Sequence, residues 1–533
     1  MTTKLLKKTL ATLVVAGLTL SLAACGGRGA KPEQTKTANS TESLQAADGN
    51  KQGEPVSGGK VTVGITQEPD SLDPHLAAAA GTKEIIYNIF EGLVKLTPQG
   101  DFEPCLAEKF ELNEAADSLV FNLRQGVKFH NGQALTPADV AYSIKRVSGL
   151  LDGEDKPLIA EFADVAEVET DEEAQTVTLK LKKPNPDFIR YMTLPIIPAD
   201  SEDQAQNPVG TGPFTFKEYL PQDRLVLDRN DSYWGERPAY IEQAVFKIVP
   251  SADAAMVDLQ AGHLDVFPYI TTDQAELIQE HYNFYDASSN MVQLWALNND
   301  RKPFNDQRVR QALNLALDKK NLEAQLTQGQ GTVLESGMSP QMGAFYNEEV
   351  NRERPADLEA ARALLQEAGL GDGFELTITV PGNYVIHVRT AEIIAAQLEP
   401  LNIKVNIKEV DWGTWLTDVY QGRNYDSTVI ALTFDYCAPD TVMGRYVSTA
   451  DHNFVNFNSE RYDNLHREAV NEMDETKRAA LYREMQAVLT EEAASVFLQT
   501  PGVRTAVKKG IGGYTTYPMY VQDMYNVYVE AGR

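Results

Sequence analysis

Glu375–Val380 (ELTITV), Lys404–Val410 (KVNIKEV) and Ser427–Phe434 (STVIALTF) are the three runs that decide the fold expected for this chain. The first alternates apolar and polar residues as a strand does, and the third is apolar along its length, as a strand buried on both faces is. Between the first two runs, Thr390–Glu399 (TAEIIAAQLE) gathers its isoleucines and a leucine on one helical face. Strands joined by crossover helices run parallel, so the sequence predicts a βαβαβ unit in an α/β protein.

Asp435 follows the most buried of these strands directly and is flanked by Phe434 and Tyr436. In open sheets of this kind, ligands bind beyond the carboxyl ends of the strands. An acid between two aromatic residues at that place predicts a contact with a ligand where little water remains. The alternative is an Asp that is solvated or caps its own loop.

Four further helices are expected to serve as scaffold. Asn305 is the expected N-cap of one, Asp357–Ala368 is an amphipathic helix ended by a glycine, and Ser459 and Thr476 are expected to cap the last two.

Length, composition and charge limit the possible functions. A chain of 533 residues exceeds one hydrophobic core, so two or three domains are expected, and 43% hydrophobic with 23% charged residues is an ordinary globular composition. Without the three lysines of the leader, 45 basic residues face 76 acidic ones, a net charge of −31. This charge argues against nucleic acid and against an anionic lipid surface as partners. Motifs of serine hydrolases, zinc proteases and thiol oxidoreductases are missing, and the seven histidines lack ligand spacing. No enzyme activity, metal or cofactor is therefore expected.

The N-terminus has the pattern of an export signal. Three lysines precede the apolar run Leu10–Ala24, which is too short to span a bilayer comfortably. Leu22–Cys25 (LAAC) resembles the lipobox of bacterial lipoproteins, in which the cysteine is lipidated. The resemblance implies a signal peptide over 1–24, a lipid on Cys25, and a tether over 25–57 that is too polar to fold. The protein would then sit at the outer face of the cytoplasmic membrane. An ordinary signal peptide with an incidental cysteine is the alternative.

Cys105 and Cys437 are the other two cysteines, and they fall in what we expect to be different domains. A disulfide between them would pin domains that need to move, so two free thiols are expected.

Eight short stretches, in a shared order from about Lys60 to the C-terminus, resemble the extracellular solute-binding proteins of family 5. These are the binding lipoproteins of ABC importers for oligopeptides, dipeptides and nickel. The stretches are Glu68–His75 (EPDSLDPH), Phe90–Leu93 (FEGL), Pro104–Glu108 (PCLAE), Phe121–Arg124 (FNLR), Val127–Gly132 (VKFHNG), Thr136–Val140 (TPADV), Gly210–Phe214 (GTGPF) and Asn230–Trp234 (NDSYW).

The resemblance implies a periplasmic-binding-protein-like fold of the cluster C type: two α/β lobes joined by two crossover segments, with an extra subdomain inserted in the first lobe. The expected first lobe covers 58–295 plus 495–533 and holds the insert at about 90–205. The expected second lobe covers 300–490.

The resemblance also implies site residues. Asp435–Pro439 (DYCAP) matches the Asp-Tyr-x-x-Pro context in which oligopeptide-binding relatives receive the α-ammonium group of a peptide. Trp412 matches a pocket aromatic, with a core aromatic as the alternative, and His387 falls near the position of the ligand's carboxylate, with a surface histidine as the alternative. Glu68 and Asp70 match the opposite wall, where the first lobe offers backbone groups to an extended peptide.

Two departures leave open how a ligand carboxylate is met. Ala431-Leu432 stands where many relatives carry Gly-Trp, and Val429 stands where some peptide binders carry an arginine. Arg389, Arg423 and Arg445 are the substitutes that the sequence offers without ranking them.

The function expected from the resemblance is that of a substrate-binding lipoprotein of an ABC importer. It would capture an extended solute, a peptide, between two closing lobes as a monomer and deliver it to the membrane permease. The alternative is a binder of a metal chelate of the nickel type, or of another small solute, for the same class of importer.

Overall fold

The parallel unit predicted over residues 375–434 forms the outer half of one sheet in the computed structural model. Strands β16 (Glu375–Pro381) and β17 (Lys404–Val410) pair in parallel, and β18 (Ser427–Thr433) pairs in parallel with the other edge of β16. Helix α8 (Val385–Leu398) buries Ile394 and Leu398 in the core shared with this sheet. The βαβαβ prediction is confirmed.

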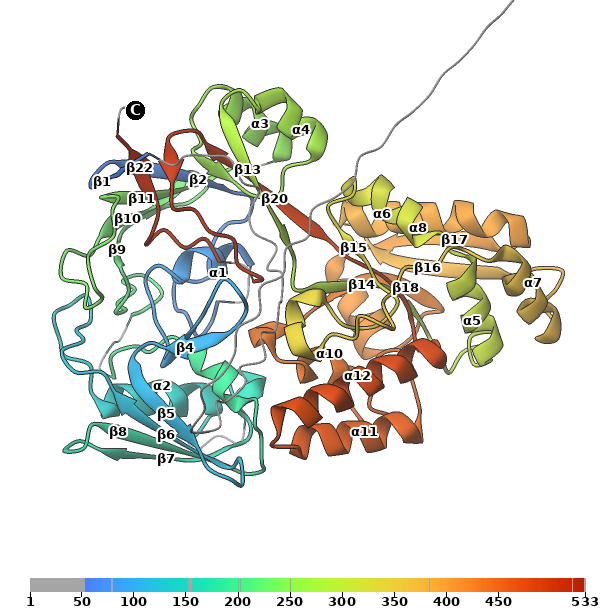
Figure 1. The fold of residues 1–533 in the computed structure, drawn as a ribbon, viewed down its shortest axis with the longest axis horizontal. Coiled ribbons are helices and arrows are strands. Elements are labelled where there is room, and N and C mark those ends of the chain that lie inside the picture. The colour runs from blue at the N-terminus through green and yellow to red at the C-terminus, as the bar shows by residue number, and fades with distance from the viewer. Residues whose placement is uncertain are drawn as a thin grey trace, which may run out of the picture. The chain divides into compact units, whose positions relative to one another are not determined.

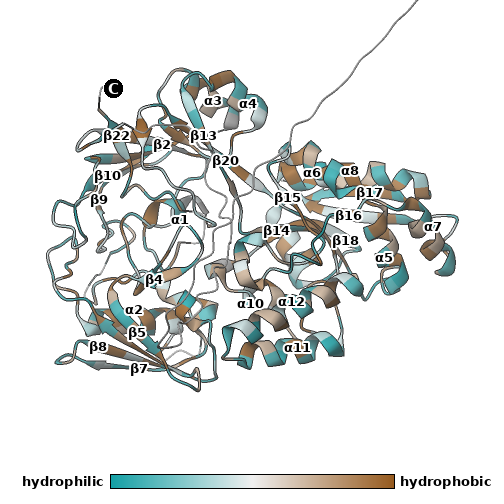
Figure 2. Ribbon diagram, viewed as in Figure 1, coloured by the Kyte–Doolittle hydropathy of each residue, from teal (hydrophilic) through white to brown (hydrophobic). Residues whose placement is uncertain are grey.

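Two antiparallel strands and a short edge strand extend this sheet to six strands, in the order β15-β19-β14-β18-β16-β17 (Figure 1). These strands are β14 (Met291–Leu297), β15 (Thr332–Val333) and β19 (Val496–Thr500). Helices surround the sheet, and α5 and α12 carry both teal and brown residues in Figure 2, as amphipathic helices do. The helices are α5 (Gln307–Ala316), α6 (Lys319–Thr327), α7 (Leu358–Glu367), α8, α9 (Trp412–Thr414), α10 (Asp440–Met443), α11 (Glu460–Asn471) and α12 (Glu475–Glu491).

The first lobe is built on a seven-stranded mixed sheet in the order β13-β20-β12-β2-β11-β10-β9. Its strands are β2 (Lys60–Ile65), β9 (Phe214–Leu220), β10 (Arg224–Arg229), β11 (Gln243–Ile248), β12 (Val266–Phe267), β13 (Tyr282–Ser288) and β20 (Gly502–Lys508). A small sheet of β1 (Pro55–Val56), β22 (Tyr528–Glu530) and β21 (Ile511–Gly512) adjoins it, with helices α1 (Ala80–Ile86), α3 (Ala252–Gln260) and α4 (Thr272–Ile278).

A four-stranded antiparallel sheet, β5-β6-β8-β7, forms the inserted subdomain together with α2. Its own core contains fully buried phenylalanines at 121, 162 and 188. The elements are β3 (Val94–Leu96), β4 (Phe102–Pro104), β5 (Ala107–Leu112), β6 (Ser118–Leu123), α2 (Pro137–Ser148), β7 (Val165–Asp171), β8 (Thr176–Leu181) and the 3-10 helix η2 (Phe188–Thr193).

The chain crosses between the lobes at Ser289–Asn290, from β13 to β14, and at Pro501, from β19 to β20. The crossing points differ from the expected boundaries 295 and 495, because β14 pairs with β18 along its whole length and β19 pairs with β14. Both strands therefore belong to the second lobe. The expected tether over 25–57 also ends too late, because Pro55 and Val56 already pair with Glu530 and Val529.

Two N-caps differ from those expected. Asp306 rather than Asn305 caps α5, by accepting from the backbone N–H of Arg308, and Asp474 rather than Thr476 caps α12. The predicted cap Ser459 is confirmed, and Asp357, which was expected to be the first residue of its helix, is the N-cap of α7.

The structure describes residues 53–77, 80–151, 156–199, 201, 203–249, 251–382, 384–519 and 521–531, with Ala80, Ala252 and Asp435 described by their backbone alone. Cys25, the leader and most of the expected tether lie outside the described residues. None of the helices in the described part of the chain combines the length and the apolar character that a membrane crossing needs.

Candidate functional site

Two adjoining cavities lie where the elements of the two lobes approach each other. We call the one of 590 Å³ the large cavity and the one of 350 Å³ the hinge cavity, since the second is bordered by the crossover residues Ser288–Met291. Lys83, Met519 and Val521 line both. The two cavities are therefore neighbours that share these three side chains.

Aromatic side chains from both lobes line the large cavity. The second lobe contributes Tyr436, and the first lobe contributes Tyr87, Phe90, Phe102, Tyr233 and Tyr525. Such a lining favours a solute with an apolar or aromatic body.

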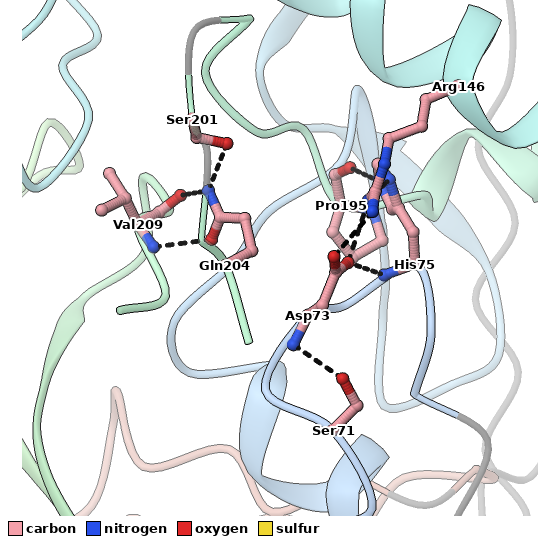
Figure 3. Close-up of polar contacts among 8 residues, drawn as sticks. All are labelled: Ser71, Asp73, His75, Arg146, Pro195, Ser201, Gln204 and Val209. Carbon is pink, nitrogen blue, oxygen red and sulfur yellow. Dashed lines mark hydrogen bonds and ion pairs between the residues drawn. The ribbon is translucent and has the colours of Figure 1, made fainter. Parts of the chain in front are cut away.

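A partly buried ion pair holds one wall of the large cavity in place (Figure 3). Arg146 on α2 donates to both carboxylate oxygens of Asp73, at 2.9 and 2.7 Å. It also lies 2.9 Å from Nδ1 of His75, whose Nε2 lies 2.8 Å from the carbonyl oxygen of Pro195. Burial lowers the pKa of His75 to about 4, so the ring is neutral, accepts from Arg146 and donates to Pro195. The family-like stretch around Asp73 and His75 thus holds the cavity wall in place.

Glu91 lies beside the aromatic side chains of the large cavity and binds three of their neighbouring groups. Its carboxylate accepts hydrogen bonds from the hydroxyl of Tyr233 at 2.7 Å, from Nε1 of Trp234 at 2.7 Å and from the hydroxyl of Thr211 at 2.8 Å. Burial raises the pKa of Glu91 in spite of these three donors. Because its oxygens are engaged, Glu91 positions Tyr233 rather than offering a free charge to a solute.

The hinge cavity lies beyond the carboxyl end of β18, where the sequence predicted ligand binding. Ala431, Leu432 and Thr433 of that strand line it. The opposite side includes Glu84 on α1, which is 4% exposed and accepts a hydrogen bond of 2.9 Å from the hydroxyl of Tyr269. Burial raises the pKa of Glu84 to about 7, against the opposing effect of that hydrogen bond.

Three crossover side chains in this cavity have unused polar atoms. Oγ of Ser288, Oγ of Ser289 and Oδ1 of Asn290 are buried and have no hydrogen-bond partner among the described residues. These three oxygens are enclosed by protein atoms, so other atoms of the three residues form the cavity wall.

The turn after β18 carries the predicted ligand acid. Asp435 begins the 3-10 helix η6 (Asp435–Cys437), and its side chain lies outside the described residues. Tyr436 and Cys437 both adopt left-handed backbone conformations, with φ of 55° and 49°. Asn290 holds the start of the turn by donating from Nδ2 to the carbonyl oxygen of Phe434.

The inserted subdomain of the first lobe contacts this turn. Nη1 of Arg190 donates to the carbonyl oxygen of Cys437 at 3.0 Å, and the rings of Tyr191 and Tyr436 meet edge to face at 5.1 Å. Ala438 packs into the core of the inserted subdomain.

A buried ion pair joins the two lobes next to this turn. Nη2 of Arg478 on α12 lies 3.2 Å from Oδ1 of Asp187, and their side chains are 7% and 10% exposed. Arg190 lies on the same Asp187 oxygen at 3.2 Å. We call the contacts of Asp187, Arg190 and Tyr191 with the second lobe the lobe contact.

Trp412, Phe434 and His387 do not line either cavity. Trp412 stacks on Trp415 at 5.2 Å and is 38% exposed, and Phe434 is fully buried in the second-lobe core. His387 is 5% exposed, which excludes the surface alternative, and Gln293 contacts its Nδ1 at 3.1 Å. Burial lowers the pKa of His387 to about 4. Their roles toward a ligand stay predictions.

Glu68 and Asp70 belong to the first lobe and also lie outside the two linings. Glu68 is exposed and accepts a hydrogen bond of 2.9 Å from the hydroxyl of Tyr219. Asp70 accepts from the hydroxyl of Thr82 at 2.6 Å. Of the seven predicted ligand residues, Tyr436 lines a cavity and Asp435 begins the same turn.

Glu84, Asn290 and Arg445 are cavity residues that the sequence did not single out as the site. Arg445 was one of three unranked arginines, whereas Glu84 and Asn290 carry no motif. The one available signal for Asn290 was its place directly before a strand.

Cys105 and Cys437 are both free and buried, as expected, and they belong to different lobes. Among the described residues no group of three or more His, Cys, Asp and Glu side chains could hold a metal ion.

Comparison with known proteins identifies the family. A family model, bacterial extracellular solute-binding proteins, family 5, matches residues 101–454. The chain is 28% identical to the dipeptide-binding protein of Escherichia coli (strain K12), covering 87% of this chain and 93% of that protein. It is 26% identical to heme-binding protein A of Haemophilus influenzae, and the match covers 98% of this chain and 99% of that protein. The solved structure of the periplasmic binding protein DppA from Helicobacter pylori, in complex with the peptide STSA, superposes on this chain with a TM-score of 0.75 and is 23% identical in sequence. The match covers 89% of this chain and 99% of the DppA chain. The chain belongs to the bacterial extracellular solute-binding proteins of family 5, a family of substrate-binding transport proteins with the two-lobed fold described above.

Proposed function

We propose that this protein captures a peptide between its two lobes and delivers it to the permease of an ABC importer. The observation that carries the proposal is the turn at Asp435, which follows β18 between the two cavities and is gripped by the opposite lobe. The dipeptide-binding relative and the peptide complex of the structural neighbour support the peptide as solute.

In this proposal Asp435 receives the α-ammonium group of the peptide. An ammonium group that leaves water needs an anion and hydrogen-bond acceptors, or its burial costs several kcal/mol. The aromatic large cavity would take an apolar side chain of the peptide.

The N-terminal sequence supports a lipid anchor in the same proposal. Leu22–Cys25 would place a lipid on Cys25 and hold the protein, as a monomer, at the outer face of the cytoplasmic membrane. The polar segment that follows would let the binding lobes turn toward the permease.

The test is calorimetric binding of short peptides to protein freed of co-purified solute by unfolding and refolding. Asp435→Ala should weaken binding by about 3–5 kcal/mol, which is about two to three and a half decades in Kd. N-acetylation of the peptide should cost a comparable amount. Asp418→Ala, an exposed acid of the same lobe, is the charge-matched control and should bind as wild type.

Unchanged affinity both in Asp435→Ala and with the acetylated peptide would exclude recognition of the peptide terminus at this turn. A nickel–histidine chelate, titrated in parallel, tests the chelate alternative. Binding of the chelate without binding of any peptide would replace the peptide proposal.

A further inference from the structure

Glu84 is the acidic side chain among the described residues that line the hinge cavity. Its Oε1 accepts the hydrogen bond from the hydroxyl of Tyr269, and this contact orients the carboxylate. Oε2 has no hydrogen-bond partner within the part of the chain that the structure describes. Protein atoms enclose the unpaired crossover oxygens, whereas Oε2 of Glu84 is not enclosed and borders the cavity. The carboxylate is thus held by one oxygen and offers the other to a ligand.

Two basic side chains line the same cavity, but neither pairs with Glu84. Lys83, its neighbour on α1, is exposed, and no basic residue in the described ranges forms an ion pair with Glu84. Arg445 is held within the second lobe by the carbonyl oxygen of Thr441 at 2.9 Å and by the hydroxyl of Tyr420 at 2.6 Å. Burial and one hydrogen bond account for the pKa of Glu84, without an effect of either basic group. The ionised carboxylate therefore lacks the cation that its burial requires, and a ligand can supply one.

Three tyrosines line the cavity together with Glu84, namely Tyr269, Tyr514 and Tyr517. Their hydroxyl protons are all used within the protein. Tyr514 donates to Oε1 of Gln522 at 3.0 Å, Tyr517 donates to Oδ2 of Asp523 at 2.8 Å, and Tyr269 donates to Glu84. A hydroxyl that has donated its proton can only accept a further hydrogen bond, and a tyrosine ring has a negative face. Acceptor oxygens and ring faces are the groups that stabilise a cation.

The position of Tyr514 ties these rings to the carboxylate. Burial, with a smaller contribution from the charge of Glu84, raises the pKa of Tyr514 to about 12, so the ring lies near this carboxylate. Tyr514 is itself 6% exposed. A cation at Glu84 would therefore be shielded from water on the side of Tyr514, where both the carboxylate and the ring act more strongly on it.

We infer that the Glu84 side of the hinge cavity is a subsite for a cation and takes the ammonium group of a lysine side chain in the peptide. The inference rests on the proposed function, which supplies the peptide. Asp435 remains the partner of the peptide's N-terminus, so a lysine peptide meets two acids, one from each lobe. The subsite selects peptides with a lysine over peptides with an apolar side chain of the same length.

The selection depends on pH, because Glu84 must be ionised to pair with the ammonium group. With its pKa at about 7, Glu84 is mostly neutral at pH 5.5 and mostly charged at pH 8. The other charged or titratable groups on the cavity walls are Lys83, Arg445 and the three tyrosines, and none of these residue types ordinarily changes charge in this range. The lysine of the peptide also stays charged. A bound cation favours ionised Glu84, so binding at pH 7 should release up to about half a proton per peptide.

The experiment measures binding of paired tripeptides by calorimetry on the full-length protein without its leader. In each pair, a lysine at one position is replaced by norleucine, which has the same carbon chain without the ammonium group, and all three positions are tried. At pH 8, wild type should bind the lysine peptide at its preferred position about 10–100-fold more tightly than the norleucine peptide. At pH 5.5 this preference should fall to within about threefold.

Glu84→Gln should remove the preference to within about twofold at both pH values and abolish the proton release. Its affinity for the norleucine peptides should stay within about threefold of wild type, which also shows that the variant is folded. Glu276→Gln changes an exposed acid on α4 that lines neither cavity, and this matched control should keep the full preference.

The outcomes separate the two proposals. Equal binding of lysine and norleucine peptides by wild type at pH 8 overturns the Glu84 inference alone. A lysine preference that survives in Glu84→Gln, or that is as large at pH 5.5 as at pH 8, overturns it as well. A Glu84-dependent preference for lysine without any effect of N-acetylation overturns the role of Asp435 alone. Failure of every peptide to bind overturns both.

Discussion

The guanidinium of Arg478 lies over the ring of Phe345, 5.8 Å from its centroid. Replacing Arg478 with methionine should therefore weaken the lobe contact without emptying the space beside that ring. Removing one partner of a buried ion pair costs about 3–5 kcal/mol, because the other charge stays buried. Asp187 would keep Arg190 at 3.2 Å, so we take about 2 kcal/mol for this site. The cost falls on the state in which the lobes touch, since Asp187 regains water when they part. A change of 1.4 kcal/mol is tenfold, so the closing equilibrium should shift about 30-fold toward the open state.

Two readouts follow this shift in the solute-free protein. Small-angle X-ray scattering should give a larger radius of gyration for Arg478→Met than for wild type. Cys437, which is 2% exposed and adjoins the lobe contact, should react faster with a thiol reagent, while Cys105 keeps its slow rate. Arg461→Met breaks an exposed pair with Glu491 in the same lobe and should change neither readout.

A double variant distinguishes charge from packing. Asp187→Asn combined with Arg478→Met removes both charges of this pair. Arg190 then loses its carboxylate but keeps its hydrogen bond to the carbonyl oxygen of Cys437, so the closing equilibrium should return part of the way toward wild type. An unchanged radius of gyration and an unchanged Cys437 rate in Arg478→Met would refute the reasoning. A double variant as open as the single one would attribute the effect to lost packing instead.

Two further predictions concern Glu84 and Cys25. Burial raises the pKa of Glu84 to about 7, so the native state holds this proton more tightly than the unfolded chain does. The contribution of this proton to the free energy of unfolding is present in full below pH 4.5 and is lost as the pH rises through 7. Glu84→Gln stays neutral, so its melting temperature should gain on wild type by a few degrees between pH 5 and pH 8, a difference of up to about 3 kcal/mol; parallel melting curves for both proteins would contradict the assignment. Cys25→Ser should move the protein from the membrane fraction of the producing cells to the soluble fraction, and continued sedimentation with membranes would rule out a lipid on Cys25.

Local patterns in the sequence predicted the parallel unit well because its three strands and its helix carry their signals within themselves. The lobe boundaries could not be placed in the same way. The sequence of Val496–Thr500 predicts a strand but does not say which sheet the strand joins. It belongs to the second lobe because it pairs with β14, a strand far earlier in the chain. The cap of α5 shows the same limit at short range: Asn305 and Asp306 are both good caps, and the carboxylate of Asp306 wins because it reaches the N–H of Arg308.

The candidate site was predicted where a motif marked it and missed where only the fold assembles it. Asp435 and Tyr436 stand in a recognisable order, so the sequence pointed to this turn, and their role toward a ligand stays a prediction. Glu84, Asn290 and Arg445 come from a helix, a crossover and a 3-10 helix that lie far apart in the chain. These residues have only the cavity in common, and residues that line one cavity follow no regular spacing in the sequence.

In the proposed function, the turn from Asp435 to Ala438 connects recognition with closure. Left-handed backbone at a residue other than glycine costs about 1–2 kcal/mol, and Tyr436 and Cys437 adopt it in succession. Asn290 supports the turn from its own lobe, whereas Arg190 and Tyr191 support it from the other lobe, so part of the compensation exists only while the lobes touch. Under the proposed function, a solute held at this turn would favour the closed state through the contacts that the turn makes with the other lobe. A solute that bound the second lobe away from the turn would lack this coupling, and its affinity would be insensitive to Arg478→Met.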